Sequence, residues 1–218
     1  MESPEKKEIR KYLIRFSNRI MRGHSAYLLW KSIKIATNIT DVGNQRAEEN
    51  ATTMNLYEEI FPAIIFSLET TFIIELHKFF DTSKEALKLI EVNTSSAGIA
   101  KSVISKEDKK NIENLVLENK QTIDHIKELR HQLFAHDKIK KEGKFLIPPT
   151  NNLDKLFDVV KEIHNIISKS TTGDFYVWAD KNGNSMKSYF NELIINLQKG
   201  REQRIKEEEE EWVKKYGK

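Results

Sequence analysis

Eight consecutive residues, 130–137, gather most of the candidate chemistry of this sequence and read RHQLFAHD. Arg130 is a permanent cation whose planar guanidinium donates in a fork to two phosphate oxygens. An imidazole has an ordinary pKa of about 6.5, so His136 suits proton transfer near neutral pH. His131 could orient the phosphate or the second imidazole. Asp137 adds a carboxylate. These side chains suit proton transfer next to a bound phosphate group.

Composition and missing motifs exclude several enzyme classes. The chain of 218 residues has no Cys, so it has no disulfide, thiolate nucleophile or cysteine zinc site. It contains no Walker loop, GxGxxG turn, HExxH helix or GxSxG elbow. No metal-ligand spacing connects His77, His125 and His164, which we expect on helix surfaces, without a function. We expect no metal and no other cofactor. With 36 basic and 33 acidic residues, charge alone does not indicate a nucleic-acid binder.

The segment around Arg130 resembles the signature of the HEPN superfamily, whose members are helical dimers. Their motif is Arg, four to six residues and then His, usually with Asn, Asp or His directly after the Arg. Arg130, His131 and His136 fit it. The abortive-infection U branch is most similar, because its motif follows an earlier helix that ends in an aromatic–Asp pair. Residues 74–81, IELHKFFD, resemble that landmark. The resemblance covers about residues 56–137.

A second pair, Arg19 and His24, has the same spacing. Ile20 follows this Arg instead of a polar residue, and we expect Gly23 to interrupt the helix. We therefore treat the pair as accidental.

The resemblance implies a metal-independent endoribonuclease that acts as a toxin in anti-phage abortive infection or in a toxin–antitoxin system. It assigns catalysis to Arg130 and His136, with His131 contributing, and implies 2′,3′-cyclic phosphate and 5′-hydroxyl products. It also implies a homodimer, an RNA substrate and an antitoxin or defence-system partner. RNA carries its own nucleophile, so these side chains can serve the reaction without a metal. The alternative is a non-catalytic HEPN-like dimer that acts as a binding or regulatory module.

Helix geometry constrains how the motif can form a site. At about 100° per residue, Arg130 and His136 lie about 120° apart around one ideal helix. Either the helix loosens near Ala135, or two copies of the motif meet across a two-fold axis. The dimers of the family correspond to the second arrangement, so we expect both motifs to line one shared cleft.

Each motif residue also has a structural interpretation. His136 continues the apolar stripe of its helix and could be a hydrogen-bonded core histidine. Arg130 could form a weak surface ion pair with Asp137 or Glu128. His131 could be a solvated helix position.

Two further features lie beside the motif. Lys138, Lys140 and Lys141 form a basic patch that could contact the RNA backbone. Asp81 matches the family landmark, but it is also well placed to cap a following helix.

The elements that carry these residues are predicted to be helices throughout. No period-two alternation lasts long enough for a sheet. We expect a single HEPN-like domain, residues 1–218, built as a bundle of four or five long helices with additional short ones. Its motif-bearing core is about 56–137, and a helical extension covers 153–218. The predicted helices are 1–23, 25–50, 56–80, 84–92, 105–137, 153–168 and a last one from about 186 into the charged run 201–211.

No stretch approaches the roughly 20 uninterrupted apolar residues that a membrane span requires. The N-terminus begins with charged residues instead of an apolar secretory segment. We therefore expect a soluble, cytoplasmic protein with no membrane partner.

Overall fold

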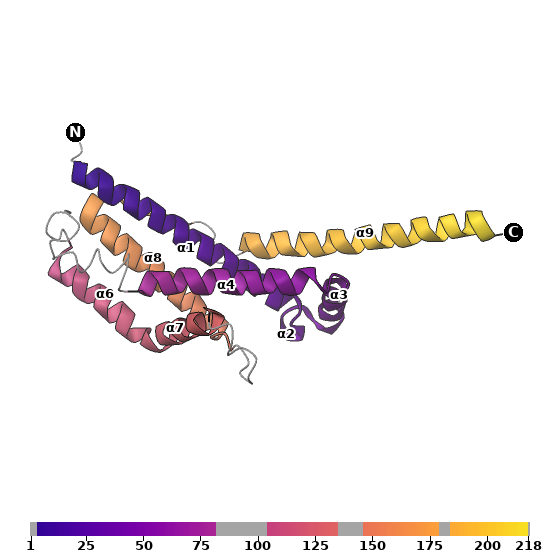
Figure 1. Cartoon of the computed structure of the whole chain (residues 1–218), viewed down its shortest axis with the longest axis horizontal. Coiled ribbons are helices and arrows are strands. Elements are labelled where there is room, and N and C mark those ends of the chain that lie inside the picture. The colour runs from indigo at the N-terminus through magenta and orange to yellow at the C-terminus, as the bar shows by residue number, and fades with distance from the viewer. Residues whose placement is uncertain (1–3, 82–103, 135–145, 179–183, 218) are drawn as a thin grey trace. The chain divides into compact units, whose positions relative to one another are not determined.

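The computed structural model describes residues 4–81, 104–134, 146–178 and 184–217. All regular structure in these ranges is helical, which confirms the predicted all-α fold (Figure 1). Contacts divide the chain into two compact units, which are described separately. The first unit combines Met1–Tyr27 with Glu69–Ala179, and the second combines Leu28–Leu68 with Asp180–Lys218. The predicted helix 84–92 lies outside the described residues.

The first unit is a helical bundle. It contains the start of α1 (Pro4–Ala36), the end of α4 (Ile60–Phe80), α6 (Lys106–Glu118), α7 (Lys120–Phe134) and α8 (Thr150–Thr172). Helices α1 and α8 run antiparallel, side by side (Figure 1). Arg10 Nε donates to Asp174 Oδ2 over 2.8 Å near one end, and Tyr27 Oη donates to Asp154 Oδ1 over 2.8 Å near the other. Helices α6 and α7 both contact α8.

Helix α1 continues through Gly23, so the predicted break there is wrong. A Cβ atom on Gly23 would lie 2.9 Å from the Cβ of Glu75 on α4, closer than real side chains approach. The absence of a side chain therefore lets α1 and α4 pack closely. Gly23 serves helix packing instead of helix termination.

The predicted helix 105–137 is two helices within the described residues. Its start is confirmed, because the Ser105 side chain accepts a hydrogen bond from the N–H of Asp108 over 3.0 Å. Asn119 separates α6 from α7 with φ −108° and ψ 10°. Its Nδ2 donates to the carbonyl of Leu115 over 2.8 Å, which satisfies one carbonyl at the end of α6. The chain thus forms two helices on either side of Asn119. The apolar stripe of α7 is buried.

Aromatic side chains of α1, α4 and α8 form the core of the first unit. The ring of Tyr27 lies 5.7 Å from that of Phe72 and 5.2 Å from that of Phe157, measured between centroids. The Tyr27 hydroxyl is bonded to Asp154 and to the carbonyl of Thr150. Burial and the Asp154 carboxylate raise the pKa of Tyr27, so it stays protonated.

His24 and His164 also belong to this core. His24 Nε2 lies 3.3 Å from Nζ of the buried Lys161. His164 is fully buried, so its predicted surface position is wrong. Its Nε2–H donates to the carbonyl of Leu13 over 3.1 Å. Burial lowers the pKa of His164, so the ring is neutral near neutral pH.

The second unit contains the rest of α1 and α4 with α2 (Ile39–Val42), α3 (Asn44–Asn55) and α9 (Asn184–Tyr216). The predicted helix 25–50 is wrong, because α1 ends at Ala36 and Gly43, with φ 84°, separates α2 from α3. Residues 201–217 of the C-terminal segment are all exposed. The core comprises Ile33, Ala36, Met54, Phe61, Phe190 and Ile194.

Among the described helices, α4 is long and apolar enough, by length and composition, to cross a membrane. In the first unit its apolar residues instead belong to a protein core, since Phe72, Ile73, Leu76 and Phe79 are at most 3% exposed. It also carries Glu75, which forms an ion pair with Arg22. The apolar character of this part of α4 is thus explained by burial inside the bundle.

Two glycines of long helices provide a matched test of the α1–α4 contact. Gly23→Ala should destabilise the protein by about 1–3 kcal/mol, because overpacking outweighs the gain in helix propensity. Gly200→Ala on α9 should stabilise it by about 0.5–1 kcal/mol, since no atom lies within 4 Å of the added Cβ. Urea unfolding followed by circular dichroism measures both. A Gly23→Ala protein as stable as Gly200→Ala would contradict the close approach.

Candidate functional site

The last turns of α7 carry the described part of the Arg–His motif. Arg130 is half-buried and His131 is exposed. Helix α7 ends at Phe134. His136, Asp137 and the predicted RNA-binding residues Lys138, Lys140 and Lys141 lie outside the described residues.

The motif lies beside the end of α4. The ring centroids of His77 on α4 and His131 on α7 are 6.2 Å apart, and the rings meet edge to face at 82°. Asp81 directly follows the last residue of α4. It lies close enough to His77 to influence its pKa, as does Arg130 from α7. The two segments on which the family resemblance was based are therefore neighbours in the first unit, although about 50 residues separate them in the sequence.

Buried apolar residues of both helices set this arrangement. On α7 they recur every three or four residues, and on α4 they flank His77. The side chains between them are held at the edge of the bundle, where they stay partly or fully accessible. The buried set is Ile123, Ile126, Leu129 and Leu133 on α7, and Leu76, Phe79 and Phe80 on α4.

The surroundings of His77 disfavour its protonated form. Partial burial lowers its pKa most, followed by the positive charge of Arg130. His131 and Lys127 lower it further, whereas the Asp81 carboxylate acts in the opposite direction. His77 is therefore a neutral, half-buried imidazole at neutral pH, and it can accept a proton.

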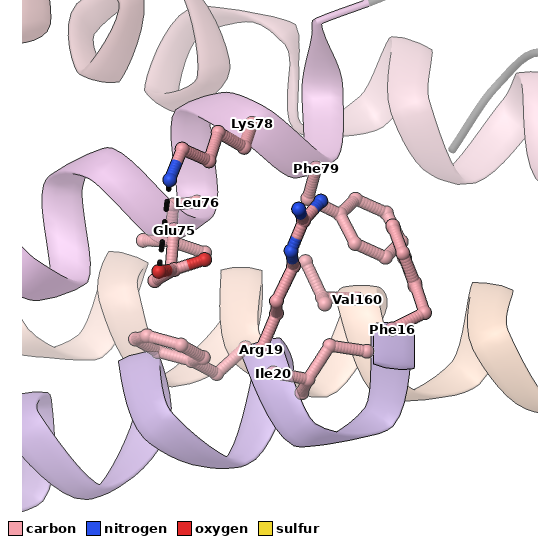
Figure 2. Close-up of a pocket in the computed structure, with 9 residues that line it drawn as sticks. Phe16, Arg19, Ile20, Glu75, Leu76, Lys78, Phe79 and Val160 are labelled. Carbon is pink, nitrogen blue, oxygen red and sulfur yellow. Dashed lines mark ion pairs between the residues drawn. The ribbon is translucent and has the colours of Figure 1, made fainter. Parts of the chain in front are cut away.

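A small pocket lies nearby, between α1, α4 and α8 (Figure 2). Its volume of about 10 Å³ suffices for about one water molecule. Figure 2 shows the Arg19 side chain extending across it from α1. Glu75 lines it with a side chain only 8% exposed, and Glu75 Oε1 lies 2.8 Å from Arg22 Nη2. The pocket is too small for a nucleotide.

The second unit has a wider groove of about 490 Å³ between α3 and α9. Amide side chains such as Asn44, Asn191 and Gln198 line much of it. Neither this groove nor the small pocket includes Arg130, His131 or His77. Arg130 and His77 are partly buried, and His131 is exposed.

Comparison with known families assigns the chain to one of them. The sequence model of the HEPN family AbiU2 matches residues 6–182. The chain belongs to the AbiU2 family of HEPN proteins. No curated protein and no solved structure shows significant similarity to it. The AbiU2 match contains the whole motif and its landmark, and it ends two residues before α9 begins.

The structure thus brings together the two segments on which the resemblance rests, and it adds His77 to the side chains that meet there. The sequence predicts no function for His77. His77 precedes Asp81 by four residues, which is one helical turn. That spacing within the landmark segment was the signal that could have identified it.

The ion pair of Glu75 with Arg22 tests how the end of α4 is held. Arg22→Ala should cost about 1–3 kcal/mol of stability, because it leaves a buried carboxylate without its nearest cation. Lys78, whose Nζ lies 3.9 Å from Oε1 on the exposed side, provides the control, and Lys78→Ala should cost less than about 1 kcal/mol. Urea unfolding measures both variants.

Adding Glu75→Gln to the Arg22→Ala variant should restore part of the loss, because a neutral amide needs no cation. Equal losses for Arg22→Ala and Lys78→Ala, with no recovery in the double variant, would contradict this assignment.

Proposed function

We propose that this protein is a metal-independent endoribonuclease that acts as a toxin in anti-phage defence, either by abortive infection or in a toxin–antitoxin system. HEPN domains commonly dimerise and act in defence systems. The observation that carries the proposal is the gathering of Arg130, His131 and His77 on an accessible edge of the first unit.

The side chains of this cluster match the needs of RNA cleavage. The 2′-oxygen attacks the adjacent phosphorus, so the site must neutralise a phosphate and move two protons. Arg130 binds the phosphate oxygens, and His136 transfers a proton. His131 orients the phosphate from the exposed face of α7. The products are a 2′,3′-cyclic phosphate and a 5′-hydroxyl.

The complete site belongs to a homodimer. On one ideal helix, Arg130 and His136 would diverge by about 120°. Two motifs facing each other across a two-fold axis supply both side chains to one strand of RNA. The basic residues Lys138, Lys140 and Lys141 contact the RNA backbone beside it.

Cleavage of total RNA in the presence of EDTA tests the activity. Wild-type protein should produce fragments that end in a 2′,3′-cyclic phosphate, whereas Arg130→Ala and His136→Ala should each lower the rate by about 100-fold or more. His125→Ala on α7 is the control and should cleave at the wild-type rate. Cleavage that both motif variants retain, or no cleavage by the wild type, would refute the nuclease and favour a binding or regulatory module.

Mixing the two inactive variants tests whether the site is shared. If Arg130 and His136 come from different protomers, a mixed dimer of Arg130→Ala and His136→Ala contains one intact site. If protomers reassort at random, half of the dimers are mixed, and each mixed dimer has one intact site out of two. The mixture should then recover about one quarter of wild-type activity. Light scattering should show a dimer throughout. A mixture as inactive as its components would place each site within one protomer.

A further inference from the structure

The position of His77 is not explained by packing. The other histidine with a lowered pKa, His164, is fully buried and donates to a backbone carbonyl. His77 is instead partly accessible and faces the ring of His131. Lys127, Arg130 and His131 face it from α7, and Lys78 and Asp81 are its charged neighbours near the end of α4.

His77 lies beside the proposed phosphate-binding motif, because its ring centroid is 6.2 Å from that of His131, the residue after Arg130. The charge of Arg130 also acts on His77. A phosphate held by Arg130 and His131 would bring its ribose to this edge of the first unit. An imidazole at this point can contact the 2′-hydroxyl, which is adjacent to the scissile phosphate.

In-line cleavage of RNA needs two groups in opposite protonation states. One must be neutral to take the proton of the 2′-hydroxyl, and the other must be protonated to give a proton to the leaving 5′-oxygen. When their surroundings give two groups different pKa values, the group with the lower pKa can act as the base and the other as the acid. Burial and neighbouring cations keep His77 in the neutral form that a base requires.

We propose that His77 is a further catalytic residue of this site and acts as the general base. This inference rests on the proposed nuclease function. His77 takes the 2′-hydroxyl proton as the 2′-oxygen forms its bond to phosphorus. The bond from phosphorus to the 5′-oxygen breaks, and that oxygen receives a proton from protonated His136. The reaction needs no other reactant, and protons balance because one is taken up and one released.

The first test compares His77→Gln with His125→Gln, a histidine substitution outside the cluster. His77→Gln should lower kcat for RNA cleavage by about 100-fold. Its affinity for an uncleavable 2′-O-methyl RNA should change less than about threefold, since the phosphate ligand Arg130 is intact. His125→Gln should match the wild type in both measurements. Wild-type kcat in His77→Gln would overturn the inference.

The second test uses the pH dependence of kcat/KM. A base must be deprotonated, so activity should fall as the pH drops through the pKa of His77. Because that pKa is lowered from its ordinary 6.5, the acid limb should lie below about pH 6.5. An acid limb at or above pH 6.5 would count against His77 as the base.

The third test does not depend on turnover. The His77 side-chain resonance should titrate below pH 6.5 in the wild type, and its pKa should rise when 2′-O-methyl RNA binds, since a phosphate then offsets the charge of Arg130. An unshifted His77 resonance with RNA bound would overturn the inference.

The failure of this inference is distinguishable from the failure of the proposed function. If Arg130→Ala and His136→Ala are inactive while His77→Gln is fully active, the nuclease stands and another group is the base. If the wild type does not cleave RNA, or both motif variants cleave it like the wild type, both proposals fail.

Discussion

Burial of the apolar faces of α4 and α7 is the constraint on which the site depends. Leu76, Phe79 and Phe80 on one helix and Leu129 and Leu133 on the other are at most 8% exposed. A helix that buries one face presents its remaining side chains at the edge of that face. His77, Arg130 and His131 occupy these edges, and the two helix ends bring them together. The proximity of these three side chains is therefore a consequence of core packing.

Burial also separates the structural ionisable groups of the first unit from those suited to chemistry. Glu75, His164 and Lys161 are at most 8% exposed, and each has a polar partner within the bundle. A buried charge or imidazole needs such partners, because its transfer from water is costly. His77 and His131 remain accessible to a ligand. His77 combines accessibility with a lowered pKa, which is typical of residues that act on a substrate.

The close packing of α1 against α4 holds the part of α4 that carries His77. Gly23 has no side chain that would separate the two helices. Arg22, the residue before Gly23, forms an ion pair with the Glu75 carboxylate. Glu75 lies only two residues before His77 on α4. The contact thus fixes the turn of α4 that leads into the cluster. Helix α9 has no such relation to the family features, since it begins beyond the matched residues 6–182.

The sequence by itself determined the helical class and the family, and it predicted the two segments that carry the candidate site. Apolar spacing of three and four residues is local information, and so is the order Arg130, His131, His136. It also identified Ser105 as a helix start, because an N-cap side chain bonds within its own first turn. The sequence predicted less well where helices continue and where they end. Gly23 is a residue that favours a helix end, yet α1 continues through it because it packs against Glu75. Asn119 gave no signal of a helix end, yet α6 ends there. Only the tertiary structure placed His77 beside His131, because that neighbourhood joins residues far apart in the chain and no local pattern encodes it.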